Sequence, residues 1–243
     1  MMQQNFYAPL IEKLFNFLDV KQRLFQENLD AEDAFVQPFI TIAREPGSGG
    51  VPIAQAVAKQ LGFEYVDEQI IEEIANSTQK RKAIVRQVDE KSRTHIEDIL
   101  HSVFNAEYMD ETTYVHELVR IILTYAYKGK TVILGRGANF ITPFARGLHV
   151  NITAPYAVRV QRAMDYEGHS NSKAKQVIAD VEKERKDFVK QFFGKNITKV
   201  NSYDISINTT YFGVQEARDV IIEALYRKFS KSLTYQQFKP KKK

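Results

Sequence analysis

A glycine-rich loop between an apolar strand and an amphipathic helix constrains the fold of this chain more than any other feature. The apolar run QPFITIA (37–43) predicts a buried strand, and the apolar residues of 51–61 repeat with the period of a helix. The loop between them contains Gly47, Gly49 and Gly50. Such a loop can bind phosphate, because glycine backbone approaches an oxyanion closely and the N–H groups of the helix N-terminus face it.

The loop lacks two residues of the common phosphate-binding pattern, G-x-x-x-x-G-K-[ST]. With Gly49 taken as the last glycine of the pattern, Gly50 stands at the lysine position and Val51 at the hydroxyl position. Arg44 then occupies the position of the first glycine. The loop alone fits two interpretations: an anion-binding site built from backbone amides, or a tight turn without a ligand.

Strands and helices are expected to alternate along the chain. Apolar runs predict four further strands, at 63–67, 131–135, 148–154 and 203–209. Helical periodicity follows them, and the whole of 76–128 is expected to be helical. The alternation predicts an α/β fold, with a parallel sheet of about five strands covered by helices on both faces.

The two ends of the chain differ from this central region. Residues 1–34 have apolar positions at helical spacing, which predicts a helical extension before a main domain at 35–231. Residues 232–243 end in KPKKK and are expected to be a basic, disordered tail. The apolar face of the extension could pack on its own domain, on a second copy of the chain or on a protein partner.

Composition excludes several classes of function. The chain has no cysteine, so thiolate metal sites and cysteine nucleophiles are excluded. The N-terminus is not typical of a signal peptide and no apolar run approaches the ~20 residues that span a bilayer, so we expect a cytoplasmic protein without membrane contact. The net charge is +4, but no nucleic-acid-binding module is present, and specific nucleic-acid binding is not expected.

Five segments in order resemble the cytidylate kinase-like family of P-loop proteins. The family loop reads like ITISREYGSGGREIA, and ITIAREPGSGGVPIA (40–54) follows it, with glycine again at the lysine position. The other four matching segments are LGFEYVDEQII (61–71), VILGRGANFI (132–141), HVNITAPYAVRVQRAMDYEG (149–168) and YDISINTT (203–210). The ordered set is more specific than any one segment.

The resemblance implies a P-loop NTPase-type sheet of the nucleoside monophosphate kinase type, with a helical lid at about 165–200. It implies ATP and Mg²⁺ as cofactors and a nucleoside monophosphate as the acceptor, with a CMP-like acceptor favoured. The donor phosphates would lie on the loop, which comprises Gly47, Ser48, Gly49, Gly50 and Val51. Asp67 and Arg136, which follow two strands, would face the acceptor.

Arginines are the expected catalytic residues, because phosphoryl transfer depends mainly on positioning and on positive charge. Arg159 and Arg162 lie three residues apart on one helix, and Arg185 follows in the lid. Arg44 could supply the charge of the missing lysine. For Arg159, Arg162 and Arg185 a role as solvated surface charge stays open.

Several features leave the function open. Asp67 could simply cap the helix that follows it. Glu68 stands where the family often has arginine, which removes one expected contact to the acceptor's phosphate. Without a hydroxyl at Val51, Mg²⁺ would need Ser48 or a carboxylate acting through water. A nucleotide kinase is therefore one hypothesis, and an inactive nucleotide-binding regulatory or adaptor protein of the same fold is the other; a non-nucleotide acceptor also remains open.

Overall fold

The computed structural model describes Lys13 and residues 37–103, 113–142 and 146–229. The helical extension predicted at 1–34 lies, except for Lys13, outside the described residues, and so does the tail predicted at 232–243.

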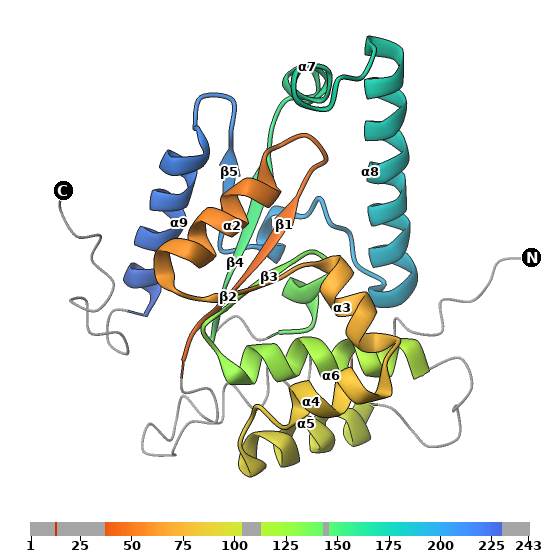
Figure 1. The fold of residues 1–243 in the computed structure, drawn as a ribbon, viewed down its shortest axis with the longest axis vertical. Coiled ribbons are helices and arrows are strands. Elements are labelled where there is room, and N and C mark those ends of the chain that lie inside the picture. Colours follow the sequence, from red (N-terminus) through yellow and green to blue (C-terminus); the bar gives the residue numbers. More distant parts are fainter. Residues whose placement is uncertain (1–12, 14–36, 104–112, 143–145, 230–243) are drawn as a thin grey trace, which may run out of the picture.

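The described residues form one parallel sheet of five strands in the order β2-β3-β1-β4-β5 (Figure 1). The strands are β1 (Phe39–Arg44), β2 (Glu64–Val66), β3 (Thr131–Leu134), β4 (Gly147–Thr153) and β5 (Ile205–Asn208). Ile42 on the central strand β1 is in register with Leu134 on one side and Val150 on the other. All five strands end at the same edge, which is where ligands bind in folds of this kind. The predicted parallel α/β sheet is confirmed.

Helices alternate with the strands along the chain. They are α2 (Gly50–Leu61), α3 (Glu68–Ala75), α4 (Thr78–Val85), α5 (Glu90–Val103), α6 (Thr113–Lys128), α7 (Tyr156–Glu167), α8 (Asn171–Phe193) and α9 (Val214–Lys228), with short 3₁₀ turns η1 (Ala138–Phe140) and η2 (Val200–Ser202). Within the described part of 76–128 there are three separate helices rather than one continuous helical stretch. Asp89 lies just before α5, and its carboxylate accepts hydrogen bonds from Ser92 N and Oγ in the first turn of that helix.

Successive strand residues point to opposite faces of the sheet, and each face has its own core. Ile40 and Ile42 pack with α2 and α9 on one face. On β3, Val132 and Leu134 belong to this first core. Ile133 lies between them, points to the other face and packs with α6 and the end of α8. Helices therefore cover both faces, as the sequence predicts (Figure 1).

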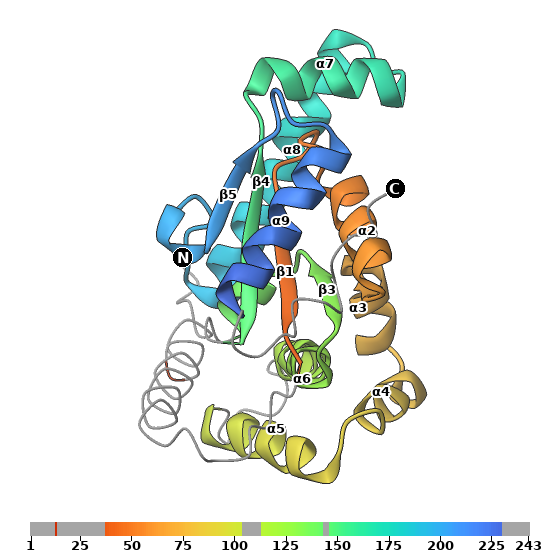
Figure 2. The same cartoon turned by 90° about the vertical axis from the view of Figure 1, so that its left-hand side faces the viewer.

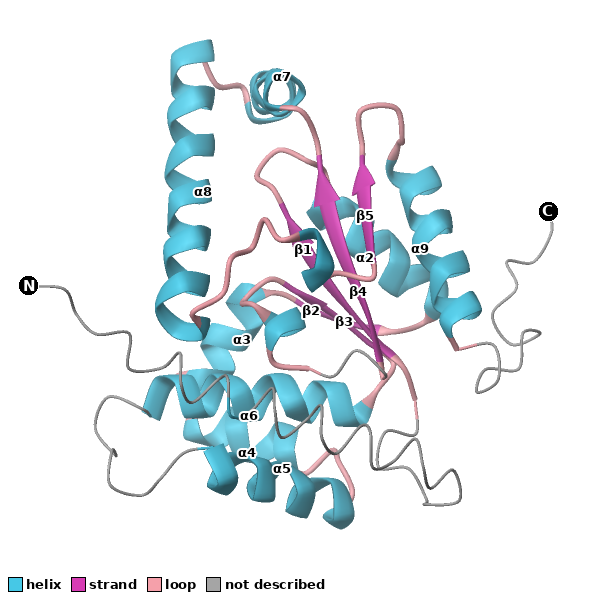
Figure 3. Ribbon diagram, turned by 180° about the vertical axis from the view of Figure 1, so that it is seen from behind, coloured by secondary structure: helices cyan, strands magenta, loops and turns pink. Residues whose placement is uncertain are grey.

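Helices α7 and α8 form a hairpin with a small core of its own. Val160 and Ala163 on α7 pack against Ala174 and Ile178 on α8, apart from both cores of the sheet. Figure 2 shows α7 crossing beyond the carboxyl ends of β4 and β5, and Figure 3 shows α8 standing beside the sheet. The hairpin thus borders the edge where the glycine loop lies.

Among the residues that the structure describes, no helix is both long and apolar enough to span a membrane.

Candidate active site

The glycine loop forms a tight turn that leaves the N-terminus of α2 uncapped. Gly47 and Gly49 have φ values of +76° and +83°, which favour glycine. The hydroxyl of Ser48 donates to the carbonyl of Glu45 at 2.8 Å, and Ser48 is buried. No described side chain makes a capping hydrogen bond to α2, so its first N–H groups can bind an anion. Val51, in the first turn, is 42% exposed.

Helix α7 packs directly on this loop. A Cβ atom added to Gly47 would lie 2.9 Å from the backbone oxygen of Arg159 and 3.1 Å from its Cβ. Any larger residue at position 47 would push α7 away from the loop, in addition to the strain of its positive φ. The glycine is therefore required by contact with α7 as well as by backbone conformation.

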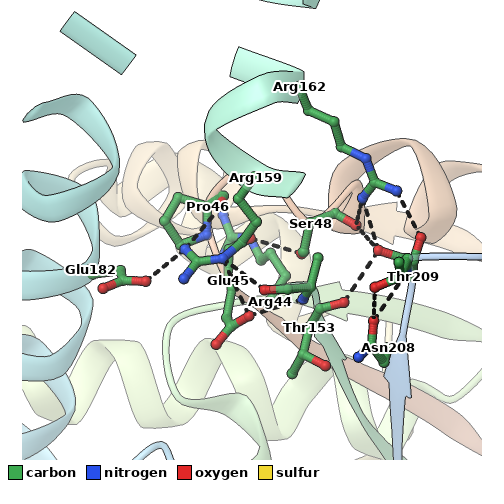
Figure 4. A network of polar contacts seen from close by, with 12 residues as sticks. Arg44, Glu45, Pro46, Ser48, Thr153, Arg159, Arg162, Glu182, Asn208 and Thr209 are labelled. Carbon is green, nitrogen blue, oxygen red and sulfur yellow. Dashed lines mark hydrogen bonds and ion pairs between the residues drawn. The ribbon is translucent and has the colours of Figure 1, made fainter. Parts of the chain in front are cut away.

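Arg159 joins the loop, α7 and α8 (Figure 4). Its side chain is 6% exposed, and its Nη1 lies 2.6 Å from Glu182 Oε1 on α8. The same guanidinium donates to the carbonyls of Ala154 and Pro46, and its Nε lies 3.5 Å from Glu45 Oε2. Arg159 is therefore a buried link beside the loop and not a solvated surface charge.

Arg162, one turn later on α7, contacts the loop from a second direction (Figure 4). Its guanidinium donates to the carbonyl of Ser48 at 3.3 Å and to Thr209, at 2.9 Å to Oγ1 and 2.7 Å to the carbonyl. The Thr209 hydroxyl donates to the same Ser48 carbonyl at 2.8 Å. The segment after β5 is thereby fastened to the glycine loop.

The Arg44 side chain begins against the glycine loop, where a Cβ atom added to Gly50 would overlap Arg44 Cβ, and its guanidinium extends toward the end of β3. Its Nη2 donates to Glu68 Oε1 at 2.8 Å, and its side chain is 6% exposed. A Cβ atom at Gly135 would overlap Arg44 Nη1, so the glycine makes room for the guanidinium. The stem of Arg44 therefore fills the space that a side chain at position 50, the lysine position, would need, whereas its guanidinium lies on the side of Asp67 and Arg136.

Arg185 reaches the same place from α8. Its Nη1 donates to the carbonyl of Arg44 at 3.1 Å, and its Nη2 lies 4.0 Å from Glu68 Oε1. Burial, together with the nearby charge of Arg44, lowers the pKa of Arg185 to about 10, although Glu68 opposes the shift. The guanidinium stays charged at neutral pH.

Arg136 lies at the turn after β3 in an unusual backbone conformation. Its φ is +49°, between two glycines that also have positive φ. Its Nη2 lies 3.2 Å from Glu72 Oε1, and its guanidinium lies 4.9 Å from the centre of the Phe188 ring. A non-glycine residue held in this region is often found at functional sites.

Asp67 caps α3. Its Oδ1 accepts hydrogen bonds from the backbone N–H groups of Gln69 and Ile70, at 3.1 and 3.0 Å. This is the capping role that the sequence left open for Asp67, and its proposed contact with an acceptor stays a prediction.

A cavity of about 450 Å³ lies between α8 and the carboxyl edge of the sheet. Arg44, Arg136 and Arg185 line one end of it together with Glu68. Polar side chains of the strands, among them Asn151 and Ser206, line another part. The volume is in the range of ordinary small-molecule sites.

Sequence reasoning missed the acidic partners of the arginines and the role of Thr209. Glu68 and Glu72 are spaced i, i+4 on α3, which puts them on one face of the helix and could have indicated a shared role. Glu45 and Glu182 carry no comparable signal, since their partner Arg159 is distant in sequence.

The described residues contain no group of three or more His, Asp or Glu side chains that could hold a metal ion. The Ser48 hydroxyl is bonded to a backbone carbonyl, and Val51 offers no oxygen ligand.

A model of the cytidylate kinase-like family matches residues 39–211, from the start of β1 to just beyond β5. The chain belongs to this family. The match covers every strand, the glycine loop and all the arginines described above. A kinase-like fold and a family relationship to nucleotide kinases are therefore shown for this cytidylate kinase-like protein.

One relative carries the name of the family, a solved structure supports the fold, and a third match covers only a small part of a different enzyme. Cytidylate kinase from Desulfurococcus amylolyticus is 27% identical over 188 residues, covering 75% of this chain and 89% of that protein. An uncharacterised protein from Eubacterium ventriosum has a solved structure with a TM-score of 0.56 and 22% identity, covering 78% of this chain and 98% of the other, which supports the fold. Uronate isomerase from Corynebacterium glutamicum is 30% identical over 99 residues, which is 40% of this chain and only 19% of that protein.

Proposed function

We propose that this protein is a nucleotide kinase-like phosphotransferase that moves the γ-phosphoryl group of ATP to a nucleoside monophosphate, with CMP as the first acceptor to test. The observation that carries the proposal is the meeting of Arg44, Arg136 and Arg185 at one end of the cavity. They come from β1, the turn after β3 and α8, so only the folded chain brings them together. Forked guanidinium groups are well suited to phosphate.

The donor triphosphate would lie on the backbone N–H groups of the glycine loop. Arg159 and Arg162 lie against that loop from α7, and we assign to them the positive charge that a lysine supplies in the common pattern. The hairpin of α7 and α8 would act as the lid of the kinase. Arg44, in contrast, would serve the acceptor.

The reaction needs no proton transfer to the protein. An unprotonated oxygen of the acceptor's phosphate attacks the γ-phosphorus, and the bond from that phosphorus to the oxygen of ADP breaks. The products are ADP and a nucleoside diphosphate, and the summed charge of the nucleotides is unchanged. The arginines would hold both phosphate groups in line and neutralise them, which is the main demand of phosphoryl transfer. Mg²⁺ would enter with ATP, held chiefly by phosphate oxygens and water.

The direct test is a coupled assay of ADP release with MgATP and each of the common nucleoside monophosphates. We expect turnover with at least one acceptor, CMP foremost, and a loss of about 100-fold or more in kcat for Arg162→Ala. Binding of ATP without turnover on any nucleoside monophosphate would contradict the proposed reaction.

One observation favours the second candidate, a nucleotide-binding regulatory protein without catalysis. Three of the arginines assigned to the phosphate groups are already bound in the structure: Arg159 to Glu182, Arg162 to Thr209 and Arg44 to Glu68. Such a protein would be stabilised by ATP in a thermal melt, because a ligand of the folded state raises the melting temperature, yet would release no ADP.

A further inference from the structure

The acceptor end of the cavity already contains an anion, the side chain of Glu68. Its Oε1 lies 2.8 Å from Arg44 Nη2 and 4.0 Å from Arg185 Nη2, so two of the three arginines converge on one carboxylate oxygen. The Glu68 side chain is 33% exposed, whereas that of Arg44 is 6% exposed. Both side chains line the cavity, and the carboxylate is the more exposed of the two.

The surroundings of Glu68 keep it negatively charged. Burial alone would raise the pKa of its carboxyl group, but Arg44, Arg185 and Arg136 outweigh burial and hold the pKa below its usual value. Gly135 allows this arrangement, since any side chain there would overlap the guanidinium of Arg44.

A carboxylate and a phosphate monoester use the same guanidinium donors. An acceptor phosphate that reached Arg44 and Arg185 would meet the negative charge of Glu68 at close range. Like charges in one site disfavour each other, so the phosphate can bind fully only if Glu68 leaves the arginines.

We propose that Glu68 is an internal competitor for the acceptor's phosphate and thereby a specificity-determining residue of the acceptor site. The proposal rests on the proposed function, because it takes the arginine cluster as the phosphate-binding part of that site. Removing the charge of Glu68 should tighten the binding of phosphate monoesters. It should leave the binding of ATP unaffected, because Glu68 contacts the guanidinium ends of Arg44 and Arg185 and not the glycine backbone proposed to hold the triphosphate.

The test compares Glu68→Gln with a matched variant on the same helix. Glutamine has the same shape and can still accept a hydrogen bond from Arg44, but it carries no charge. Glu73→Gln makes the same change on α3 at a surface residue that pairs with Lys80. Glu68→Asp keeps the charge and changes the length. Calorimetric titration of the three variants and the unaltered chain with CMP, with ATP and with inorganic phosphate gives the affinities.

We expect the dissociation constant for CMP to fall about tenfold in Glu68→Gln. In Glu73→Gln and Glu68→Asp the dissociation constant for CMP should stay within about threefold of that of the unaltered chain. The affinity for ATP should hardly change in any of the three variants. Equal or weaker binding of CMP by Glu68→Gln would overturn the inference, as would an equal gain in Glu73→Gln. A melting curve of each variant shows whether it is folded.

Failure of the proposed function gives a different result. If no nucleoside monophosphate binds or reacts with the unaltered chain, the acceptor assignment is wrong. The role of Glu68 is then decided by inorganic phosphate: tighter binding by Glu68→Gln supports it, and unchanged or weaker binding overturns it.

Discussion

Arg159 Nη1 lies 2.6 Å from Glu182 Oε1, and this ion pair connects the helix that rests on the glycine loop to the long helix beside the sheet. The pair is buried on the arginine side and 25% exposed on the glutamate side. Because Glu45 also lies next to Arg159, loss of the guanidinium would leave two carboxylates without this partner.

We therefore expect Arg159→Met to lower the free energy of unfolding by about 2 kcal/mol, less than for a fully buried pair because both carboxylates are partly exposed. Its kcat should fall at least 100-fold, since the charge beside the loop is lost. Urea unfolding and the ADP-release assay measure the two effects. Arg227→Met on α9, where Arg227 is exposed and pairs with Glu223, is the control and should change stability by under about 0.5 kcal/mol. Equal effects of the two substitutions would contradict the assignment.

Gly135→Ala should damage acceptor binding by displacing Arg44. The new Cβ would overlap Arg44 Nη1, and the φ of +85° adds strain of about 1–2 kcal/mol. Gly62→Ala is a matched control, because Gly62 has φ +66° and no heavy atom within 4 Å of an added Cβ. Steady-state kinetics should show KM for the acceptor raised about tenfold in Gly135→Ala and unchanged in Gly62→Ala. A raised KM in both variants would mean that strain alone is responsible.

Thr209→Val should weaken the attachment of the β5–α9 connection to the glycine loop. Valine keeps the shape of threonine but loses the hydrogen bonds of the buried hydroxyl with Ser48 O and Arg162, at a cost of about 1–2 kcal/mol. Because these bonds position the loop, we expect the dissociation constant for ATP to rise roughly fivefold. Thr210→Val removes a hydroxyl that bonds to Asn208 and should leave ATP binding unchanged. An unchanged affinity in Thr209→Val would show that the loop keeps its shape without this contact.

The stability contributed by Glu68 should depend on pH. Its pKa in the folded protein is held below the usual 4.5, so the stabilisation is complete above that value and is lost as pH falls through the folded pKa. The difference in melting temperature between the unaltered chain and Glu68→Gln should therefore be constant near neutral pH and shrink as the pH drops below about 4.5. Melting curves from pH 7 to pH 3 measure it. A difference that does not change with pH would mean that the carboxylate gains no stability from the arginines.

The sequence predicts the backbone elements around the site well, because these elements depend on signals that are local in the chain. The strand, glycines and helix of 39–61 lie where periodicity puts them, and Gly62 ends α2 in the left-handed conformation typical of a helix terminus. The glycines on both sides of Arg136 likewise mark a tight turn at the end of β3. These features involve residues that are neighbours in the chain.

The directions of the arginines could not be predicted in the same way. Arg44 turns toward Glu68 because Gly135, 91 positions later, leaves space there, and no local pattern contains that information. The same holds for Glu182, which meets Arg159 only after α7 and α8 have packed. From the sequence, Glu68 predicts only that one contact to the acceptor's phosphate is missing. In the structure, Glu68 forms an ion pair with Arg44.

The small core between α7 and α8 has a consequence for how the molecule opens. Four residues, Val160, Ala163, Ala174 and Ile178, fill it, and three of them carry no more than three side-chain carbons. So little apolar surface gives the hairpin less protection than the large cores on the sheet, and regions of low local stability open without unfolding the rest. Backbone amides of α7 should therefore exchange with deuterium well before those of β1 and β4, and nucleotide bound on the glycine loop should slow exchange in α7 first.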